Sequence, residues 1–248
     1  MSVGRLRWVL VALCLSAPCA RAETLPVPPG LTDFRSQDGE KLLRESTALE
    51  AYFPISANFV TQKTPAYCGV ASMVMVLNAL DAPAPPTPDD PLYKTFTQDN
   101  VLDAATEAIL PRSLLARQGM TLDQLGALLA LHPVAVGVHH AGDENLEAFR
   151  AAASAALATR DHFVIVNYLR KALSQQIGGH ISPLAAYDKT SDRFLVFDVA
   201  RYKYPPIWVK ASDLYDAMNT PDASNAGKTR GFVVVSKNDA APVTAAPK

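Results

Sequence analysis

The chain has 248 residues, of which 49% are apolar and 19% are charged, and its formal net charge is -1. A chain of this length and apolar content can bury a substantial core, in one large domain or two small ones. The near-neutral charge and the lack of any basic run argue against nucleic acid as a partner.

The first 22 residues have the layout of a secretory signal peptide. Two arginines precede an apolar stretch at 8–17, and small residues at Ala20 and Ala22 frame a cleavage site. The apolar stretch is shorter than the ~20 residues that a membrane-spanning helix needs. We therefore expect cleavage after Ala22, a periplasmic or secreted protein, and no membrane contact after processing. An uncleaved N-terminal anchor is the alternative.

Cysteine usage draws attention to one position. Cys14 and Cys19 would leave with the signal peptide, so Cys68 is the single cysteine of the mature chain, which can form no internal disulfide. An odd thiol in an exported protein either pairs with another chain or takes part in chemistry. We therefore treat Cys68 as a candidate nucleophile.

Helical patterns dominate the first part of the chain. The helices are predicted at about residues 39–46, 70–80, 100–109, 121–131 and 144–159. The segment 70–80 is apolar on all sides, which is typical of a helix buried in the centre of a domain. Thr121 and Gln124 match a capping box at the start of the fourth helix.

Strand patterns follow. The strands are predicted at residues 162–169, 180–187, 193–201 and 231–236, with 134–138 as a further candidate. Helices followed by a mostly antiparallel sheet indicate the α+β class, with a helical half packed on a sheet half. We expect one domain over residues 23–237. Residues 238–248 are rich in Ala and Pro and are expected to be a disordered tail.

Cys68 directly precedes the buried helix, which places it at or near a helix N-terminus. The helix macrodipole presents roughly half a positive charge there, and unpaired backbone N–H groups point outward. A free thiol with a pKa of about 8.5 is only about 3% thiolate at pH 7, but such surroundings lower that pKa. The amide of Gln62 can donate a hydrogen bond to an oxyanion beside the Cys68 backbone N–H. The alternative is an inert cysteine that packs as a small apolar side chain.

A base for this thiol must come from elsewhere in the chain, and His180 with Asp198 fits best. His180 begins one predicted strand, and Asp198 lies in the next, where a carboxylate without a partner is costly to bury. A connection of three or five residues would place the two directly opposite each other, whereas two or four residues would place them on opposite faces. The sequence leaves this register open.

The four other histidines are expected to have structural roles. His139 and His140 are adjacent, so in a strand they point to opposite faces of the sheet. His132 has the position of a helix-end residue, and His162 begins a strand. The sequence contains no CxxC, HExxH or Asp-rich loop, so we expect no metal site.

Several segments together resemble the phytochelatin synthase family. Residues 62–71 read Gln-x-x-x-Ala-Tyr-Cys-Gly-Val-Ala, and residues 179–183 read Gly-His-Ile-Ser-Pro. Residues 198–209 read Asp-Val-Ala-Arg-Tyr-Lys-Tyr-Pro-Pro-x-Trp-Val, and residues 230–232 read Arg-Gly-Phe. The resemblance runs in order over about residues 34–236.

This resemblance implies a papain-like cysteine protease fold, a Cys68–His180–Asp198 triad, Gln62 as oxyanion donor and glutathione as donor substrate. In that family the cysteine attacks the amide between the cysteinyl residue and glycine, and glycine leaves. The γ-glutamylcysteinyl thioester then passes its acyl group to a second glutathione, which yields a phytochelatin. No tightly bound cofactor is implied; heavy-metal ions would act as glutathione thiolates or as activators.

The resemblance also implies how glutathione is held. Arg230 is assigned to the α-carboxylate of the γ-glutamyl end, which a planar guanidinium can bind with two hydrogen bonds. Asp222 is the candidate for the α-ammonium, with Asp213 and Asp216 as rivals. The alternative for Arg230 is a simple ion pair with a surface acid.

Alternatives to synthase activity stay open. The chain is similar to short bacterial members without the Cys-rich C-terminal region of plant members, and in these water can compete as acceptor. An export signal is also unexpected for an enzyme that acts on a mostly cytosolic thiol. A glutathione hydrolase, a general papain-like peptidase, and a non-catalytic thiol- or metal-binding protein are therefore the other interpretations. A homodimer is compatible with the sequence.

Overall fold

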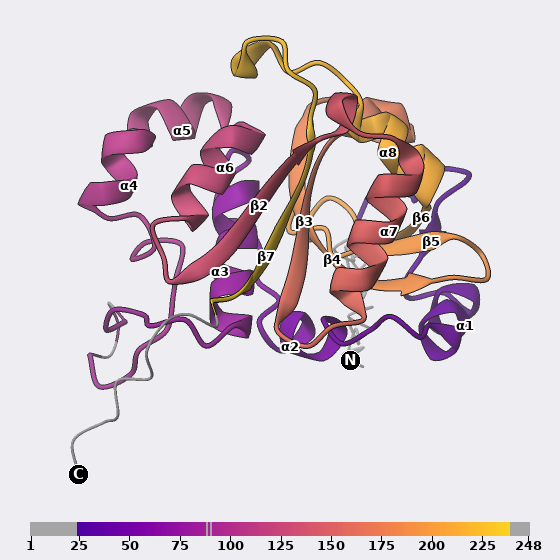
Figure 1. The fold of residues 1–248 in the computed structure, drawn as a ribbon, viewed down its shortest axis with the longest axis horizontal. Helices are drawn as coiled ribbons and strands as arrows, with labels where there is room; N and C mark the ends of the chain where they lie inside the picture. Colours follow the sequence, from indigo (N-terminus) through magenta and orange to yellow (C-terminus); the bar gives the residue numbers. More distant parts are fainter. Residues whose placement is uncertain (1–23, 88, 90, 239–248) are drawn as a thin grey trace, which may run out of the picture.

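A computed structural model describes residues 24–87, 89 and 91–238 of the chain. These residues form an α+β fold in which helices pack on both faces of an antiparallel sheet (Figure 1). The α+β class and the antiparallel sheet predicted from the sequence are confirmed. The predicted signal peptide and cleavage site lie outside the described residues, as does the predicted tail beyond Asn238.

The described part of the chain has eight α-helices: α1 (Gln37–Glu45), α2 (Tyr52–Ala57), α3 (Cys68–Ala79), α4 (Ala104–Ile109), α5 (Arg112–Gln118), α6 (Leu122–Leu129), α7 (Leu146–Leu157) and α8 (Ala211–Met218). The predicted capping box of Thr121 and Gln124 is present at the start of α6. Helix α4 begins later than predicted because the side chain of Asp103 caps it. The short helices α2, α5 and α8 were not predicted.

The sheet has seven strands in the order β1-β6-β5-β4-β3-β7-β2, and every neighbouring pair is antiparallel. The strands are β1 (Thr32–Asp33), β2 (Val134–His140), β3 (His162–Leu169), β4 (Gly179–Asp188), β5 (Arg193–Val196), β6 (Ile207–Lys210) and β7 (Gly231–Lys237). The strand predicted over 193–201 was too long, since β5 ends at Val196 and a loop follows.

Helix α3 forms the centre of the helical half and packs against β4. Its residues from Cys68 to Leu77 are all buried, as its uniformly apolar sequence predicted. Helices α7 and α8 pack against β3 from the other side of the sheet (Figure 1). Because α3 is fixed on the central strands, its N-terminus meets the end of the sheet where β4 begins.

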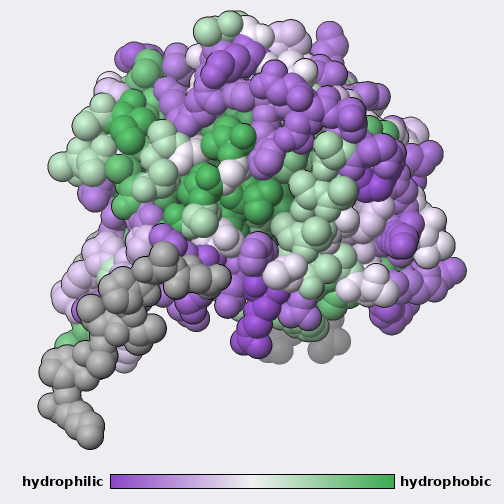
Figure 2. Space-filling view, viewed as in Figure 1, coloured by the Kyte–Doolittle hydropathy of each residue, from purple (hydrophilic) through white to green (hydrophobic). Residues whose placement is uncertain are grey.

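On the face seen in Figure 2, hydrophilic side chains gather along the top, where Figure 1 places the segment between α8 and β7. Apolar side chains gather lower on the same face, over β2. Within the described ranges, every helix is too short or too polar to cross a membrane.

Candidate active site

Cys68 is the first residue of α3 and is 8% exposed. The preceding residue, Tyr67, gives the helix no side-chain cap, so the first backbone N–H groups stay available. Ser72 donates its hydroxyl to the carbonyl of Cys68 at 2.8 Å and lies 3.3 Å from the carbonyl of Ile181 in β4. The thiol is therefore held at a helix N-terminus that is fixed to the sheet.

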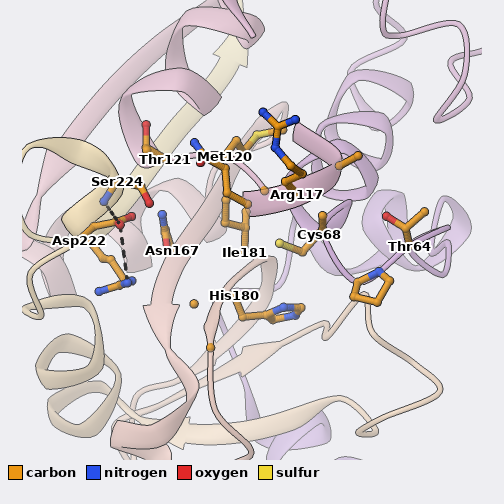
Figure 3. Close-up of a pocket in the computed structure, with 18 residues that line it drawn as sticks. Thr64, Cys68, Arg117, Met120, Thr121, Asn167, His180, Ile181, Asp222 and Ser224 are labelled. Carbon is orange, nitrogen blue, oxygen red and sulfur yellow. Dashed lines mark hydrogen bonds and ion pairs between the residues drawn. The ribbon is translucent and has the colours of Figure 1, made fainter. Parts of the chain in front are cut away.

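His180 lies at the start of β4 and is buried. Its Nε2 is 2.8 Å from Asp198 Oδ1 and 2.9 Å from Ser182 Oγ. Its ring packs edge-on against Tyr168, its neighbour in β3. The same imidazole and the Cys68 thiol shift each other's pKa, and Figure 3 shows the sulfur and the ring on the same cavity. The imidazole thus lies between the carboxylate and the sulfur.

A β-bulge brings His180 and Asp198 to one face. Strands β4 and β5 are joined by the four residues 189–192, and with that connection a regular ladder would put the two side chains on opposite faces. The register shifts by one residue between Leu184 and Ala186, which restores the common face. Asp198 is consequently a diagonal neighbour of His180, rather than directly opposite as a three- or five-residue connection would have made it.

Asp198 is fully buried and binds two cationic groups. Besides His180, the guanidinium of Arg170 contacts it, with Nη2 2.9 Å from Oδ1 and 2.8 Å from Oδ2. The backbone N–H of Ala200 donates to Oδ1 at 2.9 Å. Burial alone would raise the pKa of Asp198, but His180, Arg170 and this N–H outweigh burial and lower the pKa to about 2. The carboxylate therefore stays ionised.

The thiol and the imidazole shift each other's pKa in opposite directions. Burial raises the pKa of Cys68, but the hydrogen bond and charge of His180, with the backbone N–H groups of Ile181 and Gly69, lower it below the usual value. Burial lowers the pKa of His180, but Asp198 raises it above the usual value. Both shifts favour a thiolate beside an imidazolium, which is the reactive form of a cysteine nucleophile.

Cys68 and His180 open onto a cavity of about 480 Å³, and Asp222 and Arg230 line the same cavity (Figure 3). The structure thus brings together four of the residues singled out in the sequence, while Asp198 lies buried behind His180. The rivals of Asp222, which are Asp213 and Asp216, do not line this cavity. A cavity of this size can enclose most of a small peptide.

Arg230 and Asp222 face each other at the end of the cavity away from the thiol. Arg230 Nη2 is 3.8 Å from Asp222 Oδ1, and Nη1 donates to the carbonyl of Pro221 at 2.6 Å. The guanidinium lies over Gly179, where an added Cβ would come within 3.5 Å of Nε. Both charged side chains are largely buried, at 11% and 14% exposed. Arg230 is therefore not paired with a surface acid.

Gln62 is buried, but its amide is not among the groups that line the cavity. Its nitrogen donates to the carbonyl of Thr64 at 2.7 Å and to the hydroxyl of Tyr202 at 3.2 Å. Both amide hydrogens thus have acceptors in this structure. An oxyanion role for Gln62 would require one of these two bonds to open.

Two further residues of the site escaped the sequence analysis. Arg170 follows β3 and looks like an exposed cation of a turn, yet it is 2% exposed. Asn167 is also buried and lines the cavity, and its side-chain amide has no hydrogen-bond partner among the described residues. The signal for Asn167 was available, because an amide in the apolar run 162–169 needs a partner just as Asp198 does.

The other histidines are engaged in ordinary contacts. His139 pairs with Glu144, and His140 pairs with Asp123. Across the described residues, no three side chains of His, Cys, Asp or Glu come together as a metal-binding group.

The thiolate–imidazolium pair predicts the pH dependence of alkylation. Iodoacetamide should modify Cys68 at pH values well below the usual thiol range, because His180 stabilises the thiolate. In His180→Gln this charge is lost, so the alkylation profile should move to higher pH. The measurement is the rate of mass gain on the Cys68 peptide across pH. His162→Gln, which changes a partly exposed histidine elsewhere, is the control; identical profiles in all three proteins would contradict the pairing.

The chain is similar to a known family of proteins. The family model described as phytochelatin synthase matches residues 22–232. The chain is 34% identical over 226 residues to glutathione gamma-glutamylcysteinyltransferase 3 of Lotus japonicus, which covers 88% of this chain and 44% of that protein. It is 35% identical over 221 residues to glutathione gamma-glutamylcysteinyltransferase 1 of Triticum aestivum. This match covers 88% of this chain and 43% of that protein. The glutathione gamma-glutamylcysteinyltransferase of Schizosaccharomyces pombe is 28% identical to the chain over 194 residues. This match covers 75% of this chain and 44% of that protein.

The chain spans less than half the length of these relatives. The residues matched by the family model include Cys68, His180 and the residues that line the cavity. With a family model that matches most of the chain, the protein belongs to the phytochelatin synthase family.

Proposed function

We propose that this protein cleaves the cysteinyl–glycine amide of glutathione and transfers the γ-glutamylcysteinyl group to a second glutathione or to water. The relatives that it matches are named glutathione gamma-glutamylcysteinyltransferases. One observation carries the proposal: the reactive pair of Cys68 and His180 shares a cavity with the charged pair of Asp222 and Arg230. A nucleophile and a site for a zwitterion are what this reaction requires.

The charged pair fits the γ-glutamyl end of glutathione, which carries an α-ammonium and an α-carboxylate. Arg230 would bind the carboxylate and Asp222 the ammonium, so the substrate replaces their contact with two complementary ones. Asn167 lines the same cavity, and its side-chain amide lacks a partner among the described residues. This amide can donate to and accept from the γ-glutamyl amide of the substrate, which would satisfy a buried polar group.

In the first half-reaction, the Cys68 thiolate attacks the carbonyl carbon of the cysteinyl residue. The amide C–N bond breaks, and the His180 imidazolium gives its proton to the leaving nitrogen of glycine. A γ-glutamylcysteinyl thioester remains on Cys68. The backbone N–H of Cys68 is our first choice for the oxyanion donor, and Gln62 would join after release from Thr64 or Tyr202.

In the second half-reaction, neutral His180 accepts a proton from the α-amine of a second glutathione, or from water, as that group attacks the thioester. The C–S bond breaks and the thiolate of Cys68 is restored. Asp198 keeps the imidazole oriented and favours its protonated form throughout. This arrangement needs no tightly bound cofactor, and heavy-metal ions would enter as thiolates of the acceptor glutathione or as activators.

We also propose that the fold is papain-like. In support, the cysteine begins the buried helix α3, and the histidine lies on an antiparallel sheet packed against that helix. By the same proposal the chain acts after export, once residues 1–22 have been removed.

Product analysis tests the function. Protein that begins at Glu23 should release glycine from glutathione, together with γ-Glu-Cys from hydrolysis or γ-Glu-Cys-γ-Glu-Cys-Gly from transfer. Mass spectrometry separates these products, and Cys68→Ser is the control. Release of Cys-Gly, or of no glycine, would reject the proposal, and equal cleavage of unrelated peptides would favour a general peptidase.

A further inference from the structure

A histidine connects helix α6 to the segment 219–230, which carries Asp222 and Arg230 of the cavity (Figure 1, gold, at the top). His140 is the last residue of β2 and each of its ring nitrogens contacts a different element. Nε2 lies 2.7 Å from Asp123 Oδ1 in α6, and Nδ1 lies 2.6 Å from the backbone carbonyl oxygen of Thr229.

Both partners of the His140 ring are hydrogen-bond acceptors. A backbone carbonyl oxygen can only accept a hydrogen bond. Burial raises the pKa of Asp123, but Lys228 and His140 outweigh burial and lower it below the usual value, so Asp123 is a carboxylate and also only accepts. Both contacts are therefore hydrogen bonds only when both ring nitrogens of His140 carry a proton.

The contact with Thr229 fixes the backbone next to Arg230. The carbonyl that His140 binds belongs to the peptide bond that joins these two residues. The hydroxyl of Thr229 accepts the backbone N–H of Gly142 at 2.8 Å, and the carbonyl of Arg230 accepts the N–H of Ala141 at 2.9 Å. The residues just before β7 are thus attached to the end of β2 through His140, Ala141 and Gly142, in addition to the pairing of β2 with β7.

The charged groups around His140 come from three elements. Asp123 belongs to α6, and Lys228, on the segment itself, lies 2.8 Å from the second oxygen of Asp123. Asp143, in the short helix η1 (Ala141–Asp143), adds a negative charge near Lys228. The Lys228 side chain is 56% exposed, so its pair contributes little on its own. The His140 side chain, at 11% exposed, is the more sheltered of the two partners of Asp123.

We propose that His140 is a positioning residue, whose doubly protonated form holds the segment 219–230 in the shape that binds the γ-glutamyl end of glutathione. When His140 loses a proton, one ring nitrogen presents a lone pair to an acceptor oxygen, so one attachment is lost. Affinity for the substrate then falls while the chemistry at Cys68 is unchanged. This inference rests on the proposed function, which assigns substrate binding to Asp222 and Arg230.

Two substitutions test the inference through KM. The amide of His140→Gln cannot donate at both ends, so KM for glutathione should rise about tenfold at low pH. The kcat and the iodoacetamide reactivity of Cys68 should stay as in the wild type. In the wild type, KM should rise at the pH where the His140 ring resonance reports loss of a proton. The guanidinium of His140→Arg stays a donor across this pH range, so the rise in KM should disappear in that variant. His162→Gln is the control, in which the rise in KM should remain.

Hydrogen exchange gives a readout that needs no substrate. Protection of the amides in 219–231, corrected for intrinsic exchange rates, should fall in His140→Gln, and in the wild type once His140 loses a proton. Unchanged protection in both cases would overturn the inference whatever the substrate is. Lower protection with an unchanged KM would overturn the link to substrate binding. If the wild type releases no glycine from glutathione, the proposed function fails, while exchange in the wild type and His140→Arg still decides the role of His140.

Discussion

Replacing Cys68 with serine should lower kcat for glutathione by at least about 10³-fold. The surroundings of Cys68 lower the pKa of its thiol and so favour the thiolate. A serine hydroxyl ionises far too weakly for the same surroundings to produce an alkoxide. A serine would therefore need a neutral histidine to take its proton as it attacks. Asp198 raises the pKa of His180, so a smaller fraction of the imidazole is neutral and able to act as that base. The measurement is glycine release under saturating glutathione.

The variant should keep its fold, because serine differs from cysteine by one atom and can begin α3 in the same way. Circular dichroism should show the same helix content and nearly the same Tm. In the full-length chain, the matched control is Cys14→Ser with Cys19→Ser, which changes two thiols of the predicted signal peptide and should leave turnover intact. Wild-type turnover in Cys68→Ser would reject the assigned nucleophile.

The long elements of the fold were predictable because their patterns are strong. Helix α3 is apolar on every side, and α6 has its capping box, so both follow from local rules. The short elements β6 and α8 span four and eight residues and depend on packing that no local pattern reveals. The strand predicted through residue 201 ends early because the Asp198 carboxylate accepts the N–H of Ala200, which competes with strand pairing.

The site was predictable where one residue type had few explanations. Cys68 is a single thiol before a buried helix, and Asp198 is a carboxylate in an apolar run. Each is costly or unusual in that place unless it has a chemical role or a polar partner. The relative position of His180 and Asp198 could not be derived, since it depends on a β-bulge in β4 that no residue pattern announces. Arg170 was missed for the opposite reason: the sequence required a cationic partner for Asp198 but offered many exposed-looking candidates.

Removing Arg170 should destabilise the protein by about 3–5 kcal/mol, because the buried charge of Asp198 would keep His180 as its only cationic partner. We expect this loss for Arg170→Met, measured as the free energy of unfolding in urea. The matched control is Arg150→Met, which breaks the partly exposed pair with Asp192 and should cost only about 1 kcal/mol or less.

The double variant Arg170→Met with Asp198→Asn separates the structural role of the pair from its role in catalysis. With both charges gone, no buried ion lacks its partner, so most of the lost stability should return. Activity should not return with it, because an asparagine at position 198 would orient the imidazole of His180 without favouring its protonated form. The alkylation profile of Cys68 should then shift toward the usual thiol range, as in His180→Gln. If the double variant were no more stable than Arg170→Met, or if it regained full turnover, the ion pair would not be what holds His180 ready for the thiol.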